Sequence, residues 1–196
     1  MNQPRKVDSS AMHRAGTLIV STILLLSLPR ASQAQPPTTE ASSCPAGNLM
    51  SRARVSQATD DIRGRQSRVT DGVVAPEGAI WDAAPAVVLE TGAASITWDL
   101  GAVVTVRAGW VQADANDTYT LWGSVDGTTF TDLARVEVVD GVHGLRGRKV
   151  SLGGVPVRFV RFGEGVGDSF YSVSELQLFC EIPSPFPQKS CSSETE

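Results

Sequence analysis

The sequence predicts an all-β fold, a sandwich or jelly roll of about eight strands. Between positions 46 and 181, short runs of β-branched and aromatic residues are separated by Gly, Pro, Asp and Asn, which is typical of strands joined by turns. Several of these runs alternate apolar with polar residues, as half-buried strands do. No segment in this range keeps a helical period of apolar residues over twelve positions, which argues against a helical fold.

The 196-residue chain begins with a segment typical of export. A basic residue precedes an apolar run that ends at Leu28, and small residues follow up to Ala34, where a signal peptidase is expected to cleave. The run is too short for a membrane span of about 20 residues, and an uncleaved anchor is the alternative. We therefore expect residues 1–34 to be a signal peptide that starts at Met1 or Met12.

The rest of the chain is long enough for one domain and too short for two. We expect a linker over residues 35–43, a β domain over residues 44–181, and a disordered tail over residues 182–196. The net charge is −4 for the full chain and about −7 after cleavage, which removes four basic residues and one acidic residue. An acidic surface repels phosphate backbones and anionic lipids, so we expect no nucleic acid partner and no membrane span after cleavage.

Three cysteines in an exported chain allow one disulfide and leave one thiol over. Cys191 lies in the proline-rich tail, so the predicted pair is Cys44 with Cys180. This bridge would join the first strand of the domain to its last. Closing so long a loop removes on the order of 4 to 5 kcal/mol of unfolded-chain entropy.

The strands are expected in this order along the chain: residues 96–100, 104–110, 119–125, a return strand from about 130, then 148–152, 157–162 and 172–180. Asp126 and Gly127 predict a tight hairpin after the third of these strands, because both residues tolerate a positive φ. The four tryptophans are spread through the domain and are expected in its core.

Six short motifs follow one another in the predicted domain: Asn48-Leu49, Thr70-Asp71-Gly72 followed by Trp81, and the segments 96–101, 119–127, 157–162 and 171–176. Together they resemble the discoidin domain, also called the coagulation-factor C-type domain, which is related to galactose-binding carbohydrate modules. The resemblance implies a jelly roll of about eight strands whose loops at one end bind a ligand, commonly a glycan and sometimes a lipid headgroup or a protein. It also implies a domain without catalytic activity.

The residues agree with a non-catalytic role. The mature chain keeps one histidine, His143, and it has no cysteine, serine or metal motif that forms an activated nucleophile. An acidic pair at the site, as a hydrolase would use, stays open as an alternative. Arginine outnumbers lysine by 14 to 3, which suggests a GC-rich bacterial genome. Together with the predicted signal peptide, this predicts a secreted or periplasmic protein of the cell envelope.

For the carbohydrate-binding relatives, the resemblance implies a calcium ion held by an aspartate of the Asp-Gly turn and a glutamate of the last strand. Those positions match Asp71 and Glu175. The segment from Asp71 to Trp81 is longer than in the family and has Ala79 in place of a hydroxyl residue, so Glu77 is the expected substitute. We therefore expect Ca²⁺ at Asp71, Glu77 and Glu175. In the alternative, Asp71 caps its turn and Glu175 pairs with an arginine.

A polar loop in the middle of the chain supplies the candidate ligand residues Asp114, Asn116 and Asp117. Carboxylates and amides suit sugar hydroxyls because they accept and donate hydrogen bonds at fixed angles. Phe170 and Tyr171 are the expected aromatic partners for a sugar ring. Asp and Asn also form good turns, and this is the alternative interpretation of the loop.

Arg146 and Arg148 form the densest basic cluster of the chain. We expect them to hold a carboxylate or sulfate of an acidic glycan, with ordinary solvated or ion-paired arginines as the alternative. The sequence therefore predicts an exported, non-catalytic binding module for glycans. The rival hypothesis is a protein-interaction or adhesion component of a surface assembly, which would use the same loops on a surface protein. The sequence does not predict the oligomeric state.

Overall fold

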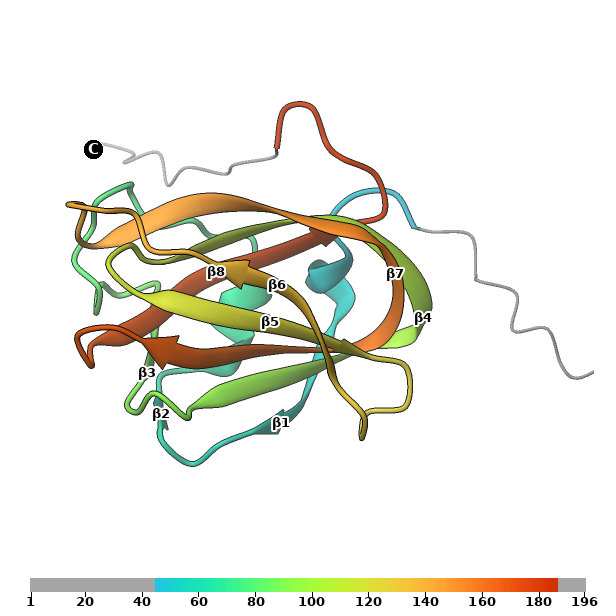
Figure 1. Cartoon of the computed structure of the whole chain (residues 1–196), viewed down its shortest axis with the longest axis horizontal. Coiled ribbons are helices and arrows are strands. Elements are labelled where there is room, and N and C mark those ends of the chain that lie inside the picture. The colour runs from blue at the N-terminus through green and yellow to red at the C-terminus, as the bar shows by residue number, and fades with distance from the viewer. Residues whose placement is uncertain (1–44, 187–196) are drawn as a thin grey trace, which may run out of the picture. The chain divides into compact units, whose positions relative to one another are not determined.

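The computed structural model describes residues 45–186 (Figure 1). Two 3-10 helices and eight strands make up this part of the chain, and the predicted all-β fold of about eight strands is confirmed. The elements are η1 (Leu49–Arg52), β1 (Arg54–Ala58), β2 (Ile62–Arg63), η2 (Gln66–Thr70), β3 (Val87–Leu89), β4 (Ser95–Asp114), β5 (Thr118–Ser124), β6 (Thr131–Val136), β7 (Leu145–Val166) and β8 (Tyr171–Phe179).

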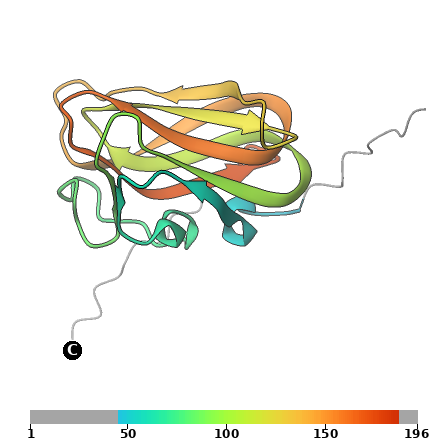
Figure 2. The ribbon, with the colours of Figure 1, turned by 90° about the horizontal axis from the view of Figure 1, so that it is seen from below.

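The strands form two antiparallel layers that share β4 and β7. The first half of β4 and the second half of β7 belong to a layer with the order β1, β4, β7, β5, β6. The other halves belong to a layer with the order β2, β3, β8, β4, β7. Figure 1 shows β4 and β7 curving together from one layer into the other, and Figure 2 shows the short helices beneath the strands.

Glycines mark the bends of the two long strands. The predicted strands 96–100 and 104–110 are one strand, β4, whose register with β7 shifts between Asp99 and Val104. Gly101 in this bend has a φ of 82°, which other residues adopt at a cost. In the same way the predicted strands 148–152 and 157–162 are both part of β7, which bends at Gly153 and Gly154. The separate strands predicted there were wrong, because these glycines bend the strand without ending it.

The main core lies between the two layers and takes side chains from both. Trp98 of β4, Leu121 of β5, Phe162 of β7 and Leu176 of β8 are fully buried in it. A smaller cluster around Trp110 packs against Val74 and Phe179. Trp98 and Trp110 are therefore buried as expected, whereas Trp81 and Trp122 are only half-buried.

The predicted hairpin between β5 and β6 is confirmed. Gly127 has a φ of 76°, and Asp126 accepts hydrogen bonds from the backbone N–H groups of Thr128 and Thr129, both at 2.8 Å. These hydrogen bonds, together with that of Ser124, hold the pKa of Asp126 well below its usual range. The turn is thus fixed by its own side chain.

The packed chain extends past residue 181, where the predicted tail begins. Phe186 lies edge-on to Phe179 at 5.6 Å between ring centroids, and the ammonium group of Lys149 lies 5.0 Å from the centre of its ring. Cys180 is disulfide-bonded, while its predicted partner Cys44 lies outside the described residues. The predicted signal peptide, linker, spare Cys191 and residues 187–196 also lie outside them. Among residues 45–186, no helix is long and apolar enough to cross a membrane.

Candidate functional site

Loops from distant parts of the sequence meet at one end of the sandwich. The loop after η2 is tied to the start of β7 by two backbone hydrogen bonds of 2.8 Å, between Gly78 and Leu145 and between Leu145 and Ala79. The loop after β4 is tied to the loop before β7 by the N–H of Ala115, which donates to the carbonyl of Gly144 at 3.0 Å. These backbone contacts fix the loops before any ligand is bound.

A pocket of about 280 Å³ lies between these loops. Its walls include Trp81, Asp114, Asn116, His143, Asp168 and Phe170. The pocket is therefore lined both by aromatic rings and by polar side chains, a combination common in sites for small ligands. A larger hollow of about 500 Å³ lies along the segments 45–47 and 179–185. It adjoins undescribed parts of the chain, and we assign no site to it.

Two aromatic rings form the apolar side of the pocket. The centroids of Trp81 and Phe170 are 5.2 Å apart, and their planes are tilted by 47°. Phe170 remains 52% exposed. An exposed aromatic ring supported by a second ring offers a flat apolar face to a ligand.

The polar side of the pocket is organised by Asp168. One of its carboxylate oxygens accepts a hydrogen bond from the amide of Asn116 at 2.6 Å, and the other accepts from the backbone N–H of Phe170 at 3.0 Å. Asp114 is buried beside them, and its Oδ1 accepts from the N–H of Ala115. Burial raises the pKa of Asp114, and the negative charge of Asp168 raises it further.

Two of the predicted ligand residues are buried behind the pocket. Asp117 is fully buried, and its carboxylate accepts hydrogen bonds from the backbone N–H of Asp168 at 3.2 Å and from the hydroxyl of Tyr119 at 3.4 Å. Burial, followed by the charges of Asp168 and Asp114, raises the pKa of Asp117 to about 6. Tyr171 is also buried and meets Tyr119 edge-on in the core. Both side chains brace the loops from within.

Arg148 faces the backbone of the loops and not the open pocket. Its guanidinium donates to the carbonyl oxygens of Asp114 at 2.8 Å, Asp117 at 3.1 Å and Glu137 at 2.9 Å. It also lies 5.8 Å from the centre of the Tyr119 ring. The residue therefore joins the ends of β4 and β6 to β7. Its Nε is buried and has no hydrogen-bond partner among residues 45–186, so the predicted grip on an acidic glycan would require the guanidinium to become exposed first.

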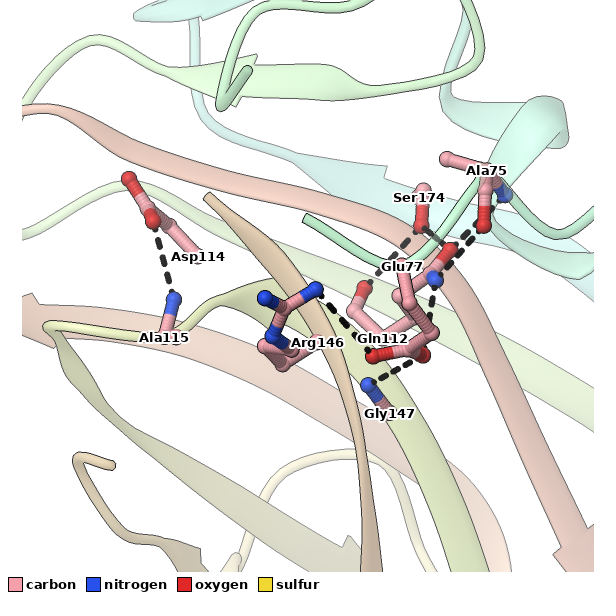
Figure 3. A network of polar contacts seen from close by, with 8 residues as sticks. All are labelled: Ala75, Glu77, Gln112, Asp114, Ala115, Arg146, Gly147 and Ser174. Carbon is pink, nitrogen blue, oxygen red and sulfur yellow. Dashed lines mark hydrogen bonds and ion pairs between the residues drawn. The ribbon is translucent and has the colours of Figure 1, made fainter. Parts of the chain in front are cut away.

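Arg146 and Glu77 lie in a polar network beside the pocket (Figure 3). The carboxylate of Glu77 accepts hydrogen bonds from the amide of Gln112 at 3.3 Å and from the N–H of Gly147 at 2.9 Å, and it pairs with Arg146 at 3.8 Å. Gln112 in turn exchanges two hydrogen bonds with the backbone of Ala75. The side chains of Arg146 and Glu77 thus mainly hold the loop against β4 and β7.

The predicted metal ligands Asp71 and Glu175 lie next to each other. The N–H of Gly72 donates to Glu175 at 3.1 Å, while Asp71 accepts from the N–H of Val73 at 2.9 Å. Glu175 is fully buried. Burial raises its pKa to about 8, and the negative charge of Asp71 adds to this effect. The amide of Gln177 donates to its other oxygen at 3.2 Å.

These two side chains fit a calcium ion in donor type, because the oxygens of Asp71 and of ionised Glu175 keep acceptor capacity beyond the hydrogen bonds that they accept. Residues 45–186 contain no group of three or more His, Cys, Asp or Glu side chains placed to hold a metal. Any further ligands there would be backbone, amide or hydroxyl oxygens or water, and Oε1 of Gln177, whose amide nitrogen donates to Glu175, is buried without a hydrogen-bond partner. Glu77 is held in the separate network around Gln112.

The structure brings together only part of the predicted ligand set. Asp114, Asn116 and Phe170 line the pocket, while Asp117, Tyr171 and Arg148 lie behind it and Arg146 lies beside it. Six lining residues were missed: Gly78, Ile80, Trp81, His143, Gly144 and Asp168. Trp81 was expected in the core, although its position in an irregular segment between Gly78 and Pro85 was a usable signal, since no strand is available there to bury it.

Comparison with solved structures shows the class of fold. Chitosan-binding module 1, derived from a chitosanase/glucanase from Paenibacillus sp. IK-5, is 22% identical with a TM-score of 0.51, and the match covers 68% of this chain and 98% of that module. The module CpGH89CBM32-5 from Clostridium perfringens, solved in complex with GalNAc-beta-1,3-galactose, is 24% identical with a TM-score of 0.47, over 68% of this chain and 99% of that one. No protein-family model and no curated protein matches the sequence.

The first of these likenesses shows that this chain shares the β-sandwich fold of that module.

Proposed function

We propose that this chain is an exported, non-catalytic module that binds glycans in the pocket between Trp81, Phe170 and Asp168. The observation that carries the proposal is the pairing of an exposed aromatic face with carboxylate and amide groups across one small pocket. The C–H face of a sugar ring packs on aromatic surface, and its hydroxyl groups need donors and acceptors at the edge. The pocket offers both.

The polar groups of the pocket retain capacity for a ligand. Asn116 uses one amide hydrogen on Asp168, which leaves its second hydrogen and its carbonyl oxygen for sugar hydroxyls. Asp168 accepts one hydrogen bond at each oxygen and can accept more. Because these groups already position one another, binding a sugar requires little reorganisation of the loops.

The fold supports binding over catalysis, since the solved module with the shared fold is named as a chitosan-binding module. We also propose that this chain is a discoidin domain, on the basis of the six sequence motifs. We further propose that residues 1–34 direct export of the chain and that Cys44 forms a disulfide with Cys180. The disulfide at Cys180 supports an oxidising compartment outside the cytoplasm.

Removing either ring of the aromatic pair is expected to abolish most glycan binding. Truncating Trp81→Ala or Phe170→Ala removes about 1.5 to 3 kcal/mol of apolar contact, which corresponds to a loss of about 10- to 100-fold in affinity. A glycan array identifies the ligand, and titration calorimetry then measures the affinity of each variant for it. Incubating the ligand with the protein and testing for hydrolysis products checks that the ligand is bound and not cleaved.

Val125→Ala is the matched control, because Val125 is 52% exposed like Phe170 but lies in the turn between β5 and β6 at the other end of β5. Its affinity should equal that of the wild type. An array without a single bound glycan would refute the proposal. Capture of one stoichiometric protein from the native envelope would then favour the rival role in a surface assembly.

We also propose that Asp71 and Glu175 hold a calcium ion that stabilises the module. At a calcium concentration about 100 times its dissociation constant, the free energy of unfolding should rise by about 2.7 kcal/mol. Differential scanning calorimetry with calcium and with a chelator measures this. Asp71→Asn should remove the stabilisation by calcium, and Glu77→Gln should retain it. Equal melting temperatures with calcium and chelator would contradict the proposal.

A further inference from the structure

Resting on the proposed glycan-binding role, we propose that the pocket selects positively charged amino sugars, such as glucosamine units, over neutral and acidic sugars. The argument starts from the charges that line it. Asp114 and Asp168 contribute carboxylates to the wall, and no Lys or Arg side chain is among the residues that line the pocket.

A third carboxylate lies directly behind this wall. Asp117 is buried under the loop that carries Asp168 and accepts its backbone N–H at 3.2 Å. The charges of Asp168 and Asp114 both contribute to the raised pKa of Asp117. The three acids therefore repel one another, and a cation placed in the pocket would relieve this repulsion.

Two arginines near the pocket offset only part of this negative charge. Arg148 keeps its positive charge while it donates to three backbone carbonyls, and its effect on the pKa of Asp114 is smaller than the opposite effect of Asp168. Arg146 lies against Gly78 of the lining and pairs with Glu77. The acidic side chains therefore outnumber the arginines, which favours an ammonium group over a uronic acid or a sulfate.

The chemistry of an ammonium group also matches the polar side of the pocket. It has three donors and no acceptor, and the exposed carboxylate of Asp168 accepts only. N-acetylation removes both the charge and two of the donors. The surrounding surface adds to the preference, since the whole chain carries a net charge of −4.

The test compares three oligosaccharides of equal length: glucosamine, N-acetylglucosamine and glucose tetramers. Calorimetry at about pH 7 leaves Asp117 mostly ionised, since its pKa is about 6, and an amine with the pKa of an α-amino group, about 7.7 to 8, mostly protonated. Each titration is run at low and at high sodium chloride. We expect the glucosamine tetramer to bind at least about tenfold more tightly than the other two. We also expect high salt to weaken this preference, because exposed charges are screened.

Two variants locate the effect. Asp168→Asn should lower the ratio of glucosamine to N-acetylglucosamine affinity several-fold, while Asp132→Asn, the same charge change on β6, should leave the ratio unchanged. This ratio of affinities can still be compared if Asp168→Asn weakens the binding of both oligosaccharides. Equal or tighter binding of a neutral tetramer, or a preference indifferent to salt and to Asp168→Asn, would overturn the inference but leave the glycan-binding role intact. Absence of binding to any saccharide would instead overturn that role itself.

Discussion

Replacing Arg148 with alanine is expected to lower the free energy of unfolding by about 3 kcal/mol. The guanidinium satisfies the carbonyl oxygens of Asp114, Asp117 and Glu137 at once. Alanine would leave these acceptors without their charged donor and would remove the contact with the Tyr119 ring. Chemical denaturation at neutral pH measures the loss, and glycan affinity should fall with it because the pocket loops are no longer tied to β7.

Arg135→Ala is the matched control for this experiment. Arg135 pairs with Glu137 at 3.7 Å, but both side chains are mostly exposed, so its removal should change stability by less than about 1 kcal/mol. Arg148→Lys should fall between the two, because it keeps the charge and loses the fork that reaches three carbonyls. Similar stabilities for Arg148→Ala and Arg135→Ala would contradict the bracing role of Arg148.

Stability in the presence of a chelator is expected to fall steeply as the pH rises from about 5 to 8. The pKa of Glu175 is raised by burial to about 8, against an ordinary value of 4.5. The folded state therefore holds this proton more tightly than the unfolded chain does. The stabilisation from this proton is fully present below the pKa of the unfolded chain. It is lost as the pH rises toward the pKa of the folded state, by a total on the order of 4 kcal/mol.

Glu175→Gln isolates this effect, since glutamine has nearly the same shape and does not titrate. The variant should show a much flatter stability profile, and at pH 8 in chelator it should be more stable than the wild type. Thermal denaturation from pH 5 to 8 provides both curves. Parallel curves for the two proteins would show that folding does not raise the pKa of Glu175, because the carboxyl group would then be ionised in this range in both the folded and the unfolded state.

Much of the fold could be predicted from local patterns. Alternation placed β4, β5 and β8, and the pair Asp126 and Gly127 predicted the hairpin correctly, because turn chemistry depends only on the residues in the turn. The continuity of β4 and β7 could not be predicted. Glycines at a bend and glycines at a strand end look alike in a sequence, and only pairing with a neighbouring strand distinguishes them.

The site could be predicted only in part, for a different reason. Asp114 and Asn116 were found because the loop after β4 is polar, but the direction of each side chain depends on contacts with loops far away in sequence. Asp117 turns inward to the N–H of Asp168, a partner 51 residues distant. Arg148 likewise resembles an available cation in the sequence, and its carbonyl partners become visible only after β7 pairs with β4.

The sharing of β4 and β7 by both layers has a consequence for how the molecule comes apart. Neither layer can peel away on its own, since each would have to tear two of its strands out of the other. Partial opening is thereby disfavoured, and loss of structure is concentrated into one concerted event. A protein built in this way presents few half-open forms to proteases.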